Sequence, residues 1–96
     1  MHPSLQTLLD AAQSVRRSEE ATERAFADAF GVGADHPEAP SVLAMVSRNR
    51  LIRLEIDDSV LDRYRTNPVE FGIYVNTIIR GAFADWRADF AKRIQS

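Results

Sequence analysis

Residues 41–57, which read SVLAMVSRNRLIRLEID, decide the fold of this chain. Ile52, Leu54 and Ile56 alternate with polar residues, which is the period-two pattern of a strand with one apolar face. Arg48 and Asn49 separate this strand from an apolar one before it, and Asn tolerates the left-handed backbone that hairpin turns require. The stretch therefore predicts a β-hairpin over residues 41–57.

Two registers of this hairpin are compatible with the sequence. A two-residue turn places Leu43 and Met45 on the apolar face, whereas a three-residue turn places Val42, Ala44 and Val46 there. Both faces of the first strand are therefore apolar. Because a two-stranded ribbon alone is marginally stable in water, we expect another element to cover the second face.

Residues 4–30, before the hairpin, predict one long helix. Ser4 can cap its start, and no Gly or Pro interrupts it before Gly31, so Gly31 or Gly33 is expected near its end. Apolar and small residues recur at intervals of three and four, close to a heptad seam that Glu19 breaks: Leu5, Leu8, Ala12, Val15, Thr22, Phe26 and Ala29. The seam predicts helix packing, with self-association as the alternative.

Residues 31–40, GVGADHPEAP, are expected to form a linker, because two Gly and two Pro oppose regular structure. His36 lies in this linker beside Asp35 and Glu38. The only other histidine is His2, which leaves too few ligands for a metal site. We expect His36 to be a solvated loop residue, and no metal or other cofactor is predicted.

A second long helix is predicted at residues 68–95, after a short helical turn at 60–64. Asn67 as the cap, Pro68 at the first position and Glu70 at the third match a capping-box start. Gly72 and Gly81 weaken this helix but would permit close packing. Its apolar stripe consists of Phe71, Val75, Ile78, Ala82, Trp86 and Phe90.

Composition indicates a single α+β domain, residues 1–96, with 27% charged residues and a net charge of −2. There is no Cys, which excludes a disulfide framework and fits a cytoplasmic protein. No run approaches the roughly 20 apolar residues that span a bilayer, and the first residues lack the features of a secretory signal. We therefore expect a cytoplasmic protein without a membrane partner.

The sequence offers no nucleophile and base for catalysis, since the two histidines lie in irregular stretches. Asp57, Asp58 and Asp62 cluster, but a strand end followed by a helix start explains these carboxylates. The chain is predicted not to be an enzyme.

Three arginines on the hairpin, Arg48, Arg50 and Arg53, are the candidate DNA-binding residues. Arginine holds phosphate groups with two parallel hydrogen bonds, and the alternative is a solvated turn. The net charge of −2 argues against strong nonspecific binding but permits a local basic patch.

The lengths of the elements predict a homodimer. Helices of about 25 residues are about 38 Å long, whereas six-residue strands cover only about 20 Å. One chain cannot cover both apolar stripes, and its sheet has two bare edges, so we expect a dimer that joins hairpins and packs long helices across its axis. The predicted interface comprises Leu43, Met45, Leu51, Ile52, Leu54, Phe71, Ile78 and Trp86.

Residues 46–61, VSRNRLIRLEIDDSVL, resemble the core of the YbaB/EbfC family. In that family a strand, a polar turn and a strand ending in Ile-Asp lead into a short turn and a long C-terminal helix, and the order is similar here over nearly the whole chain. The resemblance implies a tweezer-like homodimer in the bacterial cytoplasm that associates with the nucleoid and binds DNA. The family usually has three strands, and the prolines of residues 31–40 argue against the first one here.

The family also has divergent actinobacterial relatives linked to type VII (ESX) secretion, and a chain rich in Ala, Arg and Asp resembles actinobacterial proteins. Two functions therefore remain open. The first is a nucleoid-associated DNA-binding homodimer. The alternative is a protein-interaction or chaperone-like module beside a secretion system, which the acidic balance favours.

Overall fold

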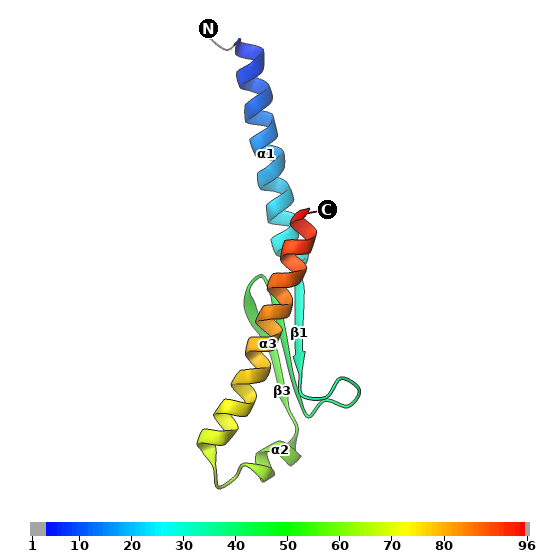
Figure 1. Ribbon diagram of the computed structural model, residues 1–96, viewed down its shortest axis with the longest axis vertical. Coiled ribbons are helices and arrows are strands. Elements are labelled where there is room, and N and C mark those ends of the chain that lie inside the picture. The colour runs from blue at the N-terminus through cyan, green and yellow to red at the C-terminus, as the bar shows by residue number, and fades with distance from the viewer. Residues whose placement is uncertain (1–3, 96) are drawn as a thin grey trace.

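The computed structural model describes residues 4–95, as six elements around one small sheet (Figure 1). They are α1 (Leu5–Asp28), β1 (Phe30–Ala34), β2 (Val42–Ser47), β3 (Arg50–Ile56), α2 (Asp58–Arg63) and α3 (Pro68–Gln95). The three strands form an antiparallel sheet in the order β1-β2-β3. The predicted α+β architecture of a long helix, a hairpin and a second long helix is confirmed, while His2 lies outside the described residues.

Helix α1 begins as the sequence predicts but ends earlier. Ser4 Oγ accepts a hydrogen bond from Thr7 N at 3.1 Å, which caps the first turn. The helix stops at Asp28, where Ala29 turns to an extended backbone and its N–H donates to Ala25 O. No glycine of the described chain has a positive φ, so neither Gly31 nor Gly33 caps this helix.

The predicted linker at residues 31–40 is wrong in its first part, because residues 30–34 form β1. The prolines that argued against a strand, Pro37 and Pro40, come after it. The two glycines serve close contact with α3. A Cβ on Gly31 would lie 2.2 Å from Ala82 O, and one on Gly33 would lie 2.2 Å from Ile78 O. Only a strand without side chains on this face can lie so close to a helix backbone.

The hairpin turn contains two residues, Arg48 and Asn49, with φ angles of 54° and 58°. Positive φ at both central positions is typical of the type I′ turn. The pairing of β2 and β3 then shifts between Met45 and Val46, which leaves Ile52 as an extra residue in β3. The bulge reconciles the two registers. The turn has two residues, yet Val42, Ala44 and Val46 lie on the face that a three-residue turn would give them.

The faces of β2 are settled by burial. Val42, Ala44 and Val46 are completely buried on the face toward α3, while Leu43 and Met45 lie half-buried on the opposite face. The buried cluster consists of Ala29, Val42, Ala44, Val46, Val60, Ile78, Ala82 and Trp86. Helix α3 therefore covers one face of the sheet, mainly over β1 and β2.

Helix α3 confirms the predicted start and stripe. Asn67 Oδ1 accepts a hydrogen bond from Glu70 N at 3.4 Å. The stripe is buried at Val75, Ile78, Ala82 and Trp86, with Phe71 and Phe90 partly buried at its ends. A Cβ added at Gly72 or Gly81 would meet no atom within 4 Å, so neither glycine serves close packing within the described chain.

The molecule is elongated, with extents of 73 × 25 × 16 Å. Phe26 anchors the end of α1 by edge-on contacts with two rings of α3. Its ring centroid lies 5.5 Å from that of Trp86 and 6.1 Å from that of Phe90. The earlier turns of α1 are exposed and project beyond the sheet as a separate arm (Figure 1). Within residues 4–95, no helix combines the length and apolar character needed to cross a membrane.

Candidate nucleic-acid and partner interface

The hairpin tip carries two exposed arginines, Arg48 and Arg50, on either side of Asn49. Within the part of the chain that the structure describes, neither guanidinium forms an ion pair. Arg48 has a left-handed backbone, which is uncommon for a residue with a long side chain. The turn thus holds two unneutralised cations at the end of a rigid ribbon.

Arg53 differs from the two tip arginines because its charge is already offset. Its Nη2 and Nε donate to Glu55 Oε1 at 2.7 and 3.1 Å. Of the three predicted DNA-binding residues, the structure therefore brings Arg48 and Arg50 together as free cations and ties Arg53 to a carboxylate.

The sheet face turned away from α3 is apolar over β1 and β2 and carries Arg53 and Glu55 on β3, and no element of residues 4–95 covers it. Val32 of β1 pairs with Met45, and Ala34 pairs with Leu43, so these side chains share one face. Phe30 and Val32 are exposed and Leu43 and Met45 are half-buried. An uncovered apolar face of this kind is typical of an interaction surface.

Strand β3 is exposed along nearly its whole length. Leu51, Ile52 and Leu54, three of the residues predicted to lie in a dimer interface, are all exposed. As the last strand of the sheet, β3 has no neighbour on its outer side in the described chain. These residues, with Leu43 and Met45, stay available for a partner.

The other predicted interface residues lie in the core. Ile78 and Trp86 are only 8% and 4% exposed, because the glycines of β1 let α3 lie directly on the sheet. Phe71 is partly buried and packs beside Tyr64, with ring centroids 6.2 Å apart. The structure therefore removes Ile78 and Trp86 from the predicted interface and leaves Phe71 at its margin.

Asp35 fastens the loop after β1 to α3, a role the sequence did not reveal. Its Oδ1 accepts hydrogen bonds from the backbone N–H groups of His36, Ser41 and Val42 at 3.0, 2.8 and 3.0 Å, and its Oδ2 accepts one from Tyr74 Oη at 2.6 Å. His36 is exposed, as predicted, with Nε2 3.8 Å from Asp35 Oδ2.

These contacts shift two titrations. Burial by itself raises the pKa of Asp35, but the hydrogen bonds from Tyr74, Val42 and Ser41, together with nearby His36, outweigh it and lower the pKa to about 2. The hydrogen bond to Asp35 in turn raises the pKa of Tyr74. A carboxylate held in its charged form by four donors serves as a structural anchor for the loop.

Two further carboxylates, Asp85 and Asp89 of α3, bind the outer edge of β1. Asp89 Oδ2 accepts from Phe30 N and Asp85 Oδ2 accepts from Val32 N, both at 2.9 Å. The Phe30 N–H, and then the Arg93 side chain, lower the pKa of Asp89. In the sequence, only the four-residue spacing of these two carboxylates hints that they act together. Solvated charges on a helix often have the same spacing, so it does not distinguish the two cases.

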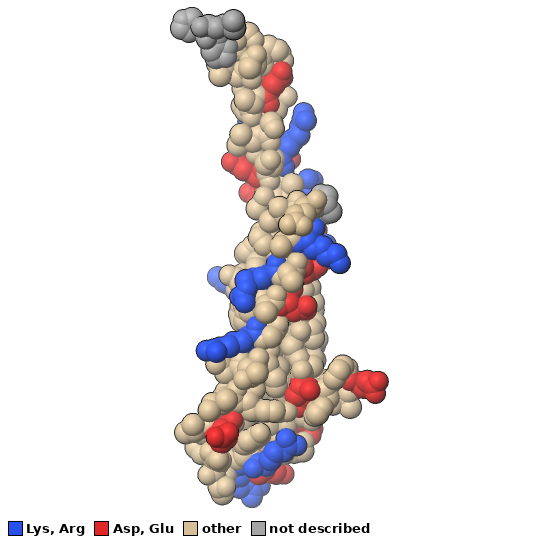
Figure 2. All heavy atoms as spheres, viewed as in Figure 1, with Lys and Arg blue, Asp and Glu red and all other residues tan. Residues whose placement is uncertain are grey.

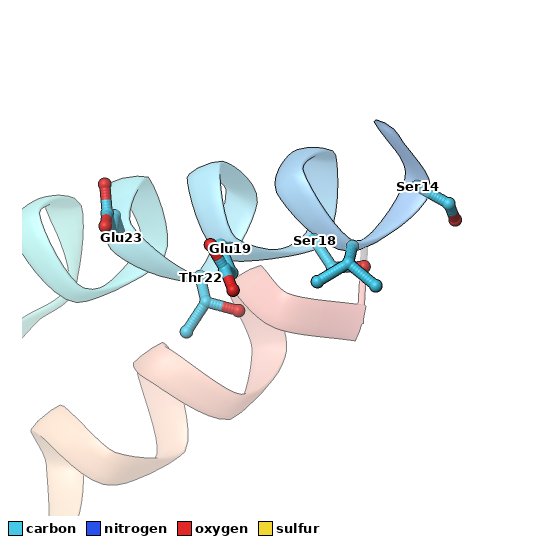
Figure 3. A pocket seen from close by; sticks show the side chains of 6 residues that line it. Ser14, Ser18, Glu19, Thr22 and Glu23 are labelled. Atoms are coloured by element: carbon cyan, nitrogen blue, oxygen red, sulfur yellow. The ribbon is translucent and has the colours of Figure 1, made fainter. Parts of the chain in front are cut away.

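Among residues 4–95, no group of three or more His, Asp or Glu side chains is placed to hold a metal ion. Figure 3 shows a surface hollow on α1, with Glu19 and Thr22 on the side turned toward α3 and Glu23 on the other side. The hollow is lined by hydroxyl and carboxylate groups, together with the apolar side chain of Val15.

Opposite charges alternate on the face of the molecule that Figure 2 shows, with basic and acidic side chains interspersed along it.

Comparisons with protein-family models, with curated proteins and with solved structures found no match to this chain.

Proposed function

We propose that this protein is a non-enzymatic homodimer that binds double-stranded DNA through its hairpin tips, in keeping with its resemblance to the YbaB/EbfC family. Such a protein would act in the bacterial cytoplasm, at the nucleoid. The observation that carries the proposal is the conformation of Arg48, which is left-handed, exposed and without an ion-pair partner in the described chain.

A left-handed backbone costs a residue with a Cβ roughly 1–2 kcal/mol, a penalty that Gly avoids. The Arg48 side chain recovers nothing through an ion pair in residues 4–95. Strain kept at an exposed cation is typical of a functional contact. With Arg50 beside it, the tip presents two guanidinium groups, each able to hold a phosphate group.

Dimerisation is supported by what one chain leaves uncovered. The sheet face away from α3 carries exposed Phe30 and Val32, and β3 has an unpaired outer edge. A second copy would cover apolar surface and double the number of tip arginines to four. Four phosphate contacts give a slope of roughly −3 to −4 for log affinity against log salt concentration.

The test compares Arg48→Gly combined with Arg50→Gln against the unchanged protein, using fluorescence anisotropy of a labelled duplex at several salt concentrations. We expect micromolar binding at low salt that falls as salt rises, and at least a tenfold loss of affinity in the variant. Gly suits the left-handed position, so the melting temperature should stay level or rise. A drop in affinity therefore cannot be ascribed to unfolding.

The matched control is Arg63→Gln with Arg65→Gln, which removes the same charge from the end of α2. This variant should keep its affinity, apart from a small loss common to any reduction of positive charge. The proposal fails if the unchanged protein does not bind duplex DNA at low salt, or if both double variants lose affinity equally.

The exposed arm of α1 favours the second candidate, a protein-interaction or chaperone-like module of an ESX secretion system without DNA binding. Leu5, Leu8, Leu9 and Val15 are all at least half exposed on this arm. An amphipathic helix of this kind fits an apolar groove on another protein. This candidate would replace the first if duplex DNA does not bind and a stoichiometric protein partner is lost on Leu8→Glu with Val15→Glu.

A further inference from the structure

The two edges of the sheet are not equivalent. On the β1 side, Asp89 and Asp85 of α3 accept hydrogen bonds from the outward N–H groups of Phe30 and Val32. On the β3 side, no further strand of residues 4–95 pairs with the sheet. Another strand can therefore join the sheet only at β3.

The backbone groups of β3 that face outward can be assigned from one hydrogen bond, which joins the residue after β3 to the residue before β2. Asp57 N donates to Ser41 O at 2.7 Å, so the groups of Asp57, Glu55 and Arg53 point toward β2. Leu54 and Ile56 then direct their N–H and C=O groups away from the sheet. The same alternation holds in β1, where Asp35 N donates to Val42 O. It turns the N–H groups of Phe30 and Val32 outward, where Asp89 and Asp85 of α3 accept their hydrogen bonds.

We propose that β3 pairs antiparallel with β3 of a second copy, around a two-fold axis at Leu54, so that the two sheets join into one of six strands. This inference rests on the homodimer of the proposed function and specifies how it is built. Each Leu54 then exchanges both backbone hydrogen bonds with Leu54 of the second copy.

The side chains of β3 match this register. It places Arg53 opposite Glu55 of the second copy and Ile52 opposite Ile56, so that opposite charges meet and apolar residues meet. A two-fold axis at Arg53 would instead set Arg53 against itself, and its backbone groups already point toward β2. Glu55 fails as a centre for the same two reasons.

Apolar surface beside β3 adds to the backbone bonds. Leu54 and Ile56 pair with Ala44 and Val42, so their side chains lie on the face toward α3. Phe83 is partly buried and lies about 200° around α3 from Asp85, which binds β1, so Phe83 faces the β3 side. Pairing of two copies brings Leu54 and Phe83 of both toward one shared boundary.

The chain has no Cys, so a single cysteine reports the geometry directly. Residues facing each other as a hydrogen-bonded pair have Cα atoms about 5.5 Å apart, within the range that a disulfide spans. We expect Leu54→Cys to form a covalent dimer under mild oxidation. Val32→Cys is the matched control, since Val32 is 41% exposed and Leu54 40%, but Val32 lies on the edge that α3 occupies.

A charge swap tests the register without altering the core. Arg53→Glu sets Glu against Glu across the axis and should weaken the dimer at least tenfold, as measured by sedimentation or light scattering against concentration. Arg53→Glu with Glu55→Arg restores opposite charges and should restore the dimer. Both side chains are exposed, so neither variant should affect folding of the single chain.

The outcomes separate this inference from the proposed function. A covalent dimer from Leu54→Cys but not from Val32→Cys, with loss and recovery in the charge swap, supports it. The β3 pairing is overturned if a stable dimer fails to cross-link at residue 54, or cross-links equally well through either cysteine. The proposed homodimer is unaffected by that result. A protein that stays monomeric at all concentrations overturns both.

Discussion

At the scale of single residues, one carboxylate explains how an irregular loop keeps its shape. Asp35 binds the backbone of residues 36, 41 and 42 and the hydroxyl of Tyr74, and so ties the loop to α3. From the sequence, Asp35 was only a neighbour of His36 in an expected linker. Its main side-chain partner lies 39 positions away, beyond the reach of any local pattern.

Asp35→Asn should make the free energy of unfolding depend less on pH below about pH 4. The folded pKa of Asp35, about 2, lies below its ordinary value of 3.8, so its contribution is complete above about pH 4 and is lost as pH falls through 2. At pH 7 the variant should be destabilised by about 1–3 kcal/mol. Urea unfolding at pH 7, 5 and 3 checks this, and a gap between the two proteins that stays constant down to pH 3 and below would contradict it.

At the scale of elements, β1 shows where sequence patterns stop. Gly-Val-Gly opposes regular structure by local propensity, yet here it forms a strand because α3 lies against its bare face. The hairpin, α3 and the caps at Ser4 and Asn67 were predictable because each depends on neighbouring residues. Contacts between distant segments, such as that of Asp85 with Val32 53 positions away, were not.

Gly31→Ala and Gly81→Ala should shift stability in opposite directions. An added Cβ at Gly31 would collide with backbone atoms of α3, and such overpacking should destabilise the protein by about 3 kcal/mol. At Gly81 the Cβ meets nothing within 4 Å, and Ala should stabilise the helix by about 1 kcal/mol. Chemical denaturation of both variants checks the contrast, and equal effects would argue against direct contact between β1 and α3.

At the scale of the whole molecule, the chain is far from compact. Its radius of gyration is 20.6 Å, whereas a compact domain of this length has about 12.5 Å. The sequence predicted that one chain could not cover the apolar stripes of both long helices, and within one chain only the stripe of α3 is buried. The structure agrees, since the arm of α1, the open sheet face and β3 all expose apolar side chains.

Solution X-ray scattering should give the dimer a longest dimension well above the 73 Å of one chain. A two-fold axis through β3 reverses the strand direction, so the two α1 arms leave the joined sheet in opposite directions (Figure 1). A doubled mass with an unchanged longest dimension would instead indicate side-by-side arms.

The carboxylates that bind β1 have a consequence for growth. A sheet with two open edges can add chains without limit, which is the route to fibrils. Here Asp85 and Asp89 close the β1 edge and leave the β3 edge open. Each chain therefore has a single edge at which another strand can pair. In the proposed β3 pairing, assembly through strands would therefore stop at two copies, and removing both carboxylates would open β1 to further strands.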